Sequence, residues 1–213
     1  LPEYLEHSGG KIYFVTRELG SLQEQLLAEG RDVPAIDASW FSVERFLERY
    51  AAESVNVKLV RLDEDVETLL RPASNKKLSQ LLQYYAEQGI EAKLASFHPR
   101  EVPALMVYPP RAELLRDSQT ALETHDLPDS MAPLVQAFVS DQLASGADWQ
   151  GTLYLNADCP FIKQLEKLEP GRLPPLLRML YEMARLFCGR LLRPAEAAAS
   201  FQEFTRALEE IAR

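Results

Sequence analysis

The last quarter of the chain, residues 152–213, constrains the fold most, because it carries more apolar surface than so small a chain can cover. It predicts a short strand, a break and a helix start, and then two helices at residues 174–191 and 195–211, each with an apolar stripe. The stripes consist of Leu176, Leu177, Leu180, Met183, Ala184, Phe187 and Leu191, and of Phe201, Phe204, Leu208 and Ile211. An antiparallel hairpin would bury only part of each stripe, so we expect the remainder to form a homodimer interface.

Composition excludes several classes of protein. With 46% hydrophobic and 26% charged residues, the 213-residue chain is typical of one large or two small soluble domains. Its net charge of -9 disfavours nucleic-acid binding, which needs clustered Lys and Arg. No apolar run approaches the ~20 residues that cross a bilayer, so we expect no membrane partner and a cytoplasmic location. Because translation begins with Met, a chain that begins at Leu1 is expected to be part of a longer protein.

Residues 1–72 alternate between strand and helix patterns. β-Branched and aromatic runs predict strands at residues 11–16, 33–36 and 55–60. Serine-capped amphipathic segments predict helices at residues 21–29 and 42–50. Strands that alternate with helices form a small parallel sheet with right-handed crossovers, which needs cover on both faces. We therefore predict an α/β module of three layers, α/β/α.

A change to charged residues and proline near residues 63–73 marks a domain boundary, and residues 73–213 are predicted to form an α+β domain that ends in the helical dimerisation hairpin. Helices are expected at residues 76–88, 113–123 and 130–143, and a strand at residues 148–155. The extended runs 91–95 and 104–108 are expected to pair antiparallel. Pro160 is expected in the first turn of a helix, where its missing N–H costs nothing.

The sequence predicts no catalytic arrangement. His7, His98 and His125 are far apart, fall in predicted loops and lack a positioned partner. A phosphate-cradling glycine loop, a nucleophile elbow and paired-histidine metal spacing are all missing from the sequence. We therefore expect this chain to be non-catalytic, without a metal or cofactor of its own.

Two further groups of residues have simple interpretations. Residues 63–65 and Glu67 could bind a divalent cation, but a solvated linker fits better because the segment lacks a glycine-containing calcium loop. Cys159 and Cys188 lack the spacing of a zinc site, so we expect reduced thiols that are buried or half-buried.

The segment 130–143 leaves two interpretations open. Met131, Leu134, Val135 and Phe138 share one side of the predicted helix. This stripe either packs on a neighbouring sheet, as most apolar stripes do, or forms an adaptable surface for unfolded chains. Trp149 could belong to either arrangement.

Several motifs support the second interpretation. Residues 10–16 read Gly-Lys-Ile-Tyr-Phe-Val-Thr, a helix pattern ends at Gly30, and Ser-Trp-Phe at residues 39–41 leads into a helix. Residues 155–163 read Leu-Asn-Ala-Asp-Cys-Pro-Phe-Ile-Lys and resemble a Leu-Asn-Pro-Asp-His-Pro signature, from which they depart at Ala157 and Cys159. Together these motifs resemble the C-terminal half of the heat-shock protein 90 chaperone family, whose bacterial members are of the HtpG type. Residues 111–127 have no clear counterpart there.

The resemblance implies an ATP-driven dimeric chaperone that is clamped at its C-terminal helices. Its nucleotide pocket, with ATP and magnesium, would lie in an N-terminal domain outside this sequence. The family's client-contacting helix aligns with residues 130–144, which makes Met131, Leu134, Val135 and Phe138 candidates for client binding. Trp149, just beyond this segment, is included as a further candidate. The implied function is to dimerise a stress-response chaperone and to bind unfolded client proteins. The alternatives are a stand-alone α/β enzyme that binds a nucleotide or metabolite at its strand ends, or a helical adaptor for another protein.

Overall fold

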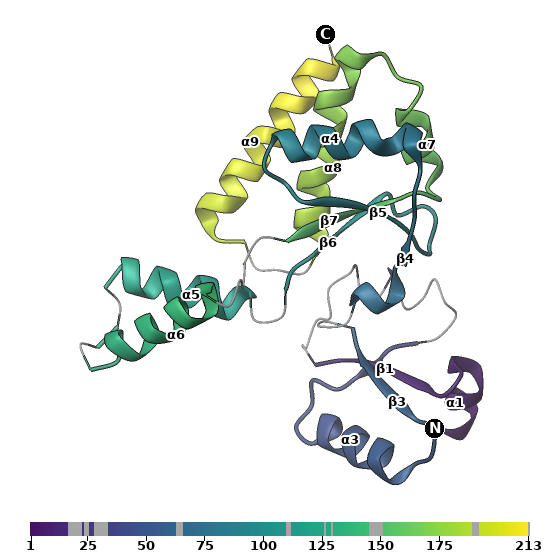
Figure 1. Cartoon of the computed structure of the whole chain (residues 1–213), viewed down its shortest axis with the longest axis vertical. Helices are drawn as coiled ribbons and strands as arrows, with labels where there is room; N and C mark the ends of the chain where they lie inside the picture. The colour runs from purple at the N-terminus through teal and green to yellow at the C-terminus, as the bar shows by residue number, and fades with distance from the viewer. Residues whose placement is uncertain are drawn as a thin grey trace. The chain divides into compact units, whose positions relative to one another are not determined.

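The computed structural model describes residues 1–16, 23, 26–27, 34–62, 66–109, 112–125, 127–128, 130–144, 151–188 and 192–212. They form a mixed α/β structure with two small sheets, which confirms the predicted class at this level (Figure 1). Contacts divide the chain into two compact units, one made of Leu1–Met106 with Leu153–Arg213 and the other of Val107–Thr152. The predicted boundary at residue 72 lies inside the first unit, where the chain passes from one sheet to the other.

The first sheet is parallel, as predicted. It consists of β1 (Lys11–Val15), β2 (Ile36–Asp37) and β3 (Lys58–Arg61), in the order β2-β1-β3. The central strand β1 is buried from Ile12 to Val15, so both of its faces are covered. Ile12 and Phe14 form a core cluster with Ala38 and Leu47. The second strand starts later than the predicted run 33–36, because it extends only as far as its pairing with Phe14 and Val15.

Two helices pack around this cluster, α1 (Pro2–Ser8) and α3 (Val43–Glu53). The serine cap predicted for the second of them is not formed. Ser42 has a left-handed backbone with φ of 77°, and its side chain makes no capping hydrogen bond, because a capping side chain needs the extended backbone of an ordinary N-cap. The predicted helix 21–29 falls mostly outside the described residues. Within this range the structure describes Gln23, Leu26 and Leu27, and all three are helical.

The second sheet corrects one prediction. It contains β4 (Arg71–Pro72), β5 (Ala92–Ser96), β6 (Ala104–Val107) and β7 (Thr152–Asn156), in the order β4-β5-β7-β6. The expected antiparallel pairing of β5 with β6 is therefore wrong, because β7 lies between them and runs parallel to β5. The physical reason is burial: Leu153 and Leu155 of β7 are fully buried, and a strand buried on both faces is most stable at the centre of a sheet.

Helices pack against this sheet as the apolar periodicity predicts. The chain runs through η1 (Val66–Leu69), η2 (Lys76–Leu78), α4 (Ser79–Glu87), α7 (Pro160–Leu165), η3 (Pro170–Arg172), α8 (Leu173–Phe187) and α9 (Pro194–Ile211). Pro160 opens α7, as predicted. The buried Tyr85 of α4 donates a hydrogen bond of 2.8 Å to the carbonyl of Leu177, which fastens α4 to α8. Helices α8 and α9 lie side by side and antiparallel (Figure 1).

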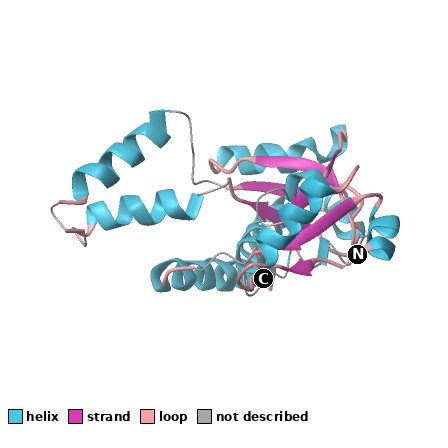
Figure 2. Cartoon of the chain, turned by 90° about the horizontal axis from the view of Figure 1, so that it is seen from below, coloured by secondary structure: helices cyan, strands magenta, loops and turns pink. Residues whose placement is uncertain are grey.

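The second unit is a helical hairpin of α5 (Ala112–Glu123) and α6 (Ala132–Ala144), which pack against each other (Figure 2). It is inserted between β6 and β7, which are neighbours in the sheet although 44 residues separate Val107 from Thr152 in the sequence. None of the helices in the described part of the chain is long and apolar enough to span a membrane.

Candidate protein-interaction surfaces

Helix α6 exposes an unusual amount of apolar surface. Leu134 is 69% exposed and Met131 is 49% exposed, whereas Val135 and Phe138 are half-buried. Val139, on the side of the helix away from Leu134, is buried. We call Met131, Leu134, Val135, Phe138 and the exposed Leu143 the α6 surface. Of the predicted client-binding residues, Leu134, Val135 and Phe138 lie on α6 and Met131 directly precedes it, whereas Trp149 lies outside the described residues.

The composition of α6 explains why this surface stays open. Within its 13 residues, Asp141 is the only charged side chain, and apolar residues occur on all sides of the helix. A helix that is apolar all round is normally buried. Helix α6 packs on α5, whose Ala112 and Leu115 are buried, but one narrow helix covers only one side of another. The remaining apolar side chains of α6 are left in contact with water.

The α8–α9 hairpin separates the predicted dimer residues into two groups. Leu177, Leu180 and Ala184 are buried within the chain itself, where a second copy cannot reach them. These three side chains, predicted for the dimer interface, are instead part of the core of the chain. Leu176, Met183 and Phe204 are half-buried, and Leu191 lies outside the described residues.

The second group forms an open surface on the hairpin. Phe201 is 67% exposed, and Phe187, Leu208 and Ile211 are each between two- and three-fifths exposed. Leu186, which the sequence reasoning missed, is 41% exposed beside Phe187. We call these five residues the hairpin surface. The signal for Leu186 was available, because Leu186 follows Met179 and Met183 at helical spacing.

The spacing along α9 explains its exposure. Phe201, Phe204, Leu208 and Ile211 follow each other at intervals of three or four residues, so they lie on one side of the helix. The buried positions Ser200 and Ala207 lie beside this stripe and face the rest of the chain. Arg178 of α8 forms ion pairs with Glu203 and Glu210 of α9, which hold the two helices together at their polar edge.

The signature at residues 155–163, which we call the Asn156 motif, has a structural role that the sequence did not reveal. Asn156 is fully buried, and its amide nitrogen donates hydrogen bonds of 3.0 Å to the carbonyls of Phe97 and Val102. Its amide oxygen accepts from the backbone N–H of Asp158 at 3.1 Å. This side chain therefore fastens the loop between β5 and β6 to the end of β7, where α7 begins. Cys159 of the same motif is buried as a free thiol, as predicted, and so is Cys188.

The ionisable residues that the sequence singled out have contacts of other kinds in the described part of the chain. No group of three His, Cys, Asp or Glu residues there is close enough to hold a metal ion. The Nδ1 atoms of His7 and His125 lie within hydrogen-bond distance of backbone carbonyls in their own segments. Glu67 accepts a hydrogen bond of 2.6 Å from the Tyr154 hydroxyl, and residues 63–65 lie outside the described residues.

A third exposed group surrounds the start of α3. Phe41 is almost fully exposed, Trp40 is about three-quarters exposed, and Phe46 is more than half exposed while its ring stacks on Tyr50. In the sequence, Trp40 and Phe41 were used only as part of a family motif. Their exposure depends on the loop that precedes α3, which the sequence pattern did not resolve.

Comparison of the chain with protein-family models and with curated protein sequences found no match. The resemblance to the heat-shock protein 90 family therefore rests on the motifs quoted above. The structure adds two extended apolar surfaces on helices, and these are the observations from which a function can be proposed.

Proposed function

We propose that this chain is the dimerising and client-binding part of a chaperone of the heat-shock protein 90 type. The observation that carries the proposal is the α6 surface, where Met131, Leu134 and Leu143 are exposed at a helix that has one charged residue. Large exposed apolar surfaces are uncommon on proteins that act alone and usually mark binding sites for other proteins. The hairpin surface adds a second such site on α8 and α9.

The hairpin surface suits a two-fold dimer. Its exposed residues occur on two antiparallel helices, so a second copy placed by two-fold rotation would complete a four-helix bundle. Phe201 would supply an aromatic anchor, the kind of side chain that dominates the energy of such interfaces. The buried residues Leu177 and Leu180 would support the interface from below by fixing α8 on the sheet.

The α6 surface suits partners of varied shape. Met131 is flexible and polarizable, and the leucines beside it impose no polar requirement, so different apolar segments can pack there. With Asp141 as its only charged side chain, α6 also repels neither acidic nor basic clients strongly. Binding at this surface needs no defined sequence in the partner, as expected for recognition of unfolded chains.

We also propose that the first module has three layers. Ile12 and Phe14 face the cluster that α1 and α3 cover, and Tyr13 and Val15 on the opposite face are buried as well. The helical residue Leu27 is 2% exposed, consistent with a helix over that second face.

In this proposal the chain performs binding and no chemistry. A lasting dimer formed through the hairpin surface of α8 and α9 would raise the effective concentration of two ATPase domains attached to the same chains. The closure of these domains on each other would then be intramolecular. ATP and magnesium would bind in those domains, in the cytoplasm, and not in the chain described here.

An aggregation assay tests the proposal. A thermally unfolded reporter protein is heated with the chain, and light scattering is followed with time. We expect the chain to suppress scattering, and the double substitution Met131→Ser and Leu134→Ser to weaken suppression severalfold. The matched control replaces two exposed polar residues of the same helix, Gln136→Ser and Ser140→Gln. Equal suppression by all three proteins would refute client binding at α6.

A further inference from the structure

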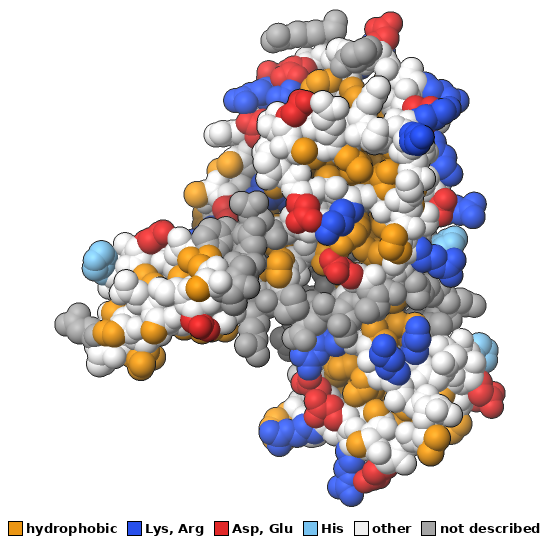
Figure 3. All heavy atoms as spheres, viewed as in Figure 1, with side chains coloured by type: hydrophobic (Ala, Val, Ile, Leu, Met, Phe, Trp, Pro, Cys, Tyr) orange, Lys and Arg blue, Asp and Glu red, His pale blue; other side chains and the backbone are white. Residues whose placement is uncertain are grey.

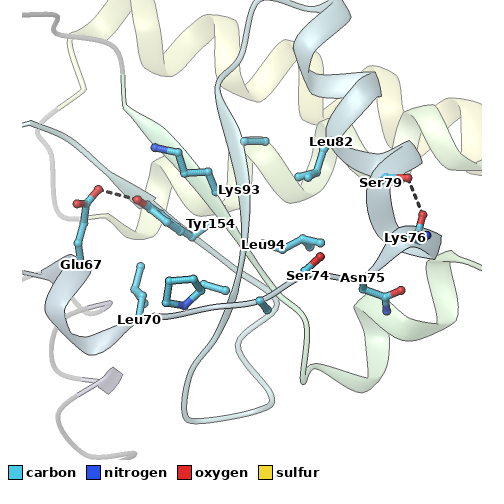
Figure 4. Close-up of a pocket in the computed structure, with 14 residues that line it drawn as sticks. Glu67, Leu70, Ser74, Asn75, Lys76, Ser79, Leu82, Lys93, Leu94 and Tyr154 are labelled. Carbon is cyan, nitrogen blue, oxygen red and sulfur yellow. Dashed lines mark hydrogen bonds between the residues drawn. The ribbon is translucent and has the colours of Figure 1, made fainter.

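A groove of about 590 Å³ lies at the edge of the second sheet (Figure 4). It runs between α4 and strand β5 and continues past β4 to η1. Its walls include Leu70, Ala73, Lys76, Leu82, Lys93 and Tyr154. In Figure 3, hydrophobic side chains gather on the face of the first unit that carries α4 and β5, with charged side chains around them. This volume is in the range of cavities that bind ligands of several hundred daltons.

The floor of the groove is an open strand edge. Strand β5 bonds to β7 through residues 91 and 95, because the Leu153 N–H donates to the Glu91 carbonyl and the Ala157 N–H donates to the Ala95 carbonyl. Backbone groups alternate in direction along a strand, so those of Ala92 and Leu94 point to the opposite edge.

Strand β4 covers only part of that edge. It pairs with Ala95 and Ser96, and the Ala73 N–H still reaches the Leu94 carbonyl at 3.1 Å. Continuing this register would place Asn75 opposite Ala92. Instead the Asn75 side chain accepts the Lys77 N–H and begins η2, so the chain turns away. Among the described residues, none pairs with the N–H or the carbonyl of Ala92.

The side chains along the groove favour binding of an apolar segment in an extended conformation. Leu70, Leu82 and Leu94 provide apolar contacts on both sides of the open edge. Tyr154 lies beside Lys93 in the sheet, and its hydroxyl is held by Glu67, so the ring forms a rigid part of the wall (Figure 4). An unpaired strand edge is satisfied best by another extended backbone.

Charge at the groove favours an acidic partner. Lys76 and Lys93 both line the groove. Lys93 pairs with Glu91 at 2.8 Å, but no ion pair is formed by Lys76 within the described residues. The adjacent Lys77 points elsewhere and pairs with Glu166 at 3.1 Å. Glu67 also lines the groove, but it accepts the hydrogen bond of the Tyr154 hydroxyl, so Lys76 is the lining residue with which a carboxylate of a partner would pair.

We propose that an extended segment of another protein, with apolar side chains and one acidic residue, adds to the edge of β5 at Ala92 and places its carboxylate near Lys76. This binding is distinct from capture of unfolded clients at the α6 surface. It selects a strand conformation and a charge, whereas α6 selects only apolar character.

The probe is a fluorescein-labelled peptide of about eight residues that alternates Thr and Val around one central Glu, and a second peptide carries Lys in place of Glu. Binding to the whole chain is measured by fluorescence anisotropy and by amide chemical shifts. We expect saturable binding of the acidic peptide at about 100 µM, with the largest shifts at Ala92 and Lys93. The Lys peptide should bind at least about fivefold more weakly.

Three variants make the test specific. Lys76→Glu should weaken binding by about tenfold, whereas the matched control Lys77→Glu, with the same charge change, should alter it by less than about twofold. Ala92→Pro removes the N–H that faces the groove and should therefore abolish binding. The variant should still fold, because proline is tolerated at the first residue of a strand. Lys76→Glu lies on the surface and keeps the test decisive if Ala92→Pro unfolds the chain.

Several results would overturn the proposal. Equal effects of the two lysine variants would show that only overall charge matters. Largest shifts on α6, or full binding by a folded Ala92→Pro variant, would place the peptide elsewhere. Shifts at Ala92 that grow with protein concentration without peptide would show that a second copy occupies the groove.

Discussion

Replacing Asn156 with alanine should destabilise the chain more than any other single change to a polar residue of the Asn156 motif. The substitution removes three side-chain hydrogen bonds of 3.0–3.1 Å, to Phe97, Val102 and Asp158, and two longer ones. Each good bond contributes about 1 kcal/mol. The buried carbonyls of Phe97 and Val102 are also left without this donor. Together these losses predict a decrease of about 3–4 kcal/mol in the free energy of unfolding.

Urea unfolding followed by circular dichroism measures this decrease directly. The matched control is Asn75→Ala, which removes one hydrogen bond of 3.0 Å at a partly exposed position and should cost about 1 kcal/mol. A loss below about 1 kcal/mol for Asn156→Ala, or one equal to that of the control, would show that the loop between β5 and β6 does not depend on this side chain.

The remaining predictions concern burial, pH and binding. Leu180→Asp should unfold the chain, because Leu180 is 3% exposed, whereas Phe201→Asp should leave the chain folded and lower its melting temperature only through weakening of the dimer; equal effects would contradict the assigned burial. Burial raises the pKa of Tyr85, so the unfolded tyrosine ionises first and the free energy of unfolding should fall by about 1.4 kcal/mol per pH unit above about pH 10. Tyr85→Phe should reduce this fall in urea titrations at pH 9–11, while costing about 1 kcal/mol at pH 7 through the lost bond to Leu177. Met131→Ser with Leu134→Ser should weaken suppression of aggregation without changing the mass of the dimer, and a changed mass would place α6 in the dimer interface.

Local sequence patterns predicted most elements because those patterns depend on neighbours in the chain. The β-branched run at residues 11–16 became β1, and Pro160 opened α7. Apolar periodicity placed α8 and α9 to within a few residues of their observed ends. The largest difference is at the C-terminal end of α8, which was predicted at residue 191 and is observed at Phe187. These features need no knowledge of which segments meet in space.

Apart from the serine cap at Ser42, the failures involve contacts between distant segments. The position of β7 between β5 and β6 depends on a strand that follows β6 by 44 residues, so no local pattern could reveal it. The stripe on α8 contains residues that face the sheet and residues that face water, and only the packed structure separates Leu180 from Phe187. Asn156 resembled a family motif, but its role depends on carbonyls of Phe97 and Val102 that the fold brings to it.

The central claim, that the hairpin surface dimerises the chain, is tested most directly by sedimentation equilibrium of the chain and of a double variant, Phe201→Asp with Leu208→Asp. We predict the mass of a dimer for the chain at about 10 µM and the mass of a folded monomer for the variant, because two charges would be buried at the interface. A chain that sediments as a monomer at about 1 mM, or a variant that keeps the mass of the dimer, would contradict the claim.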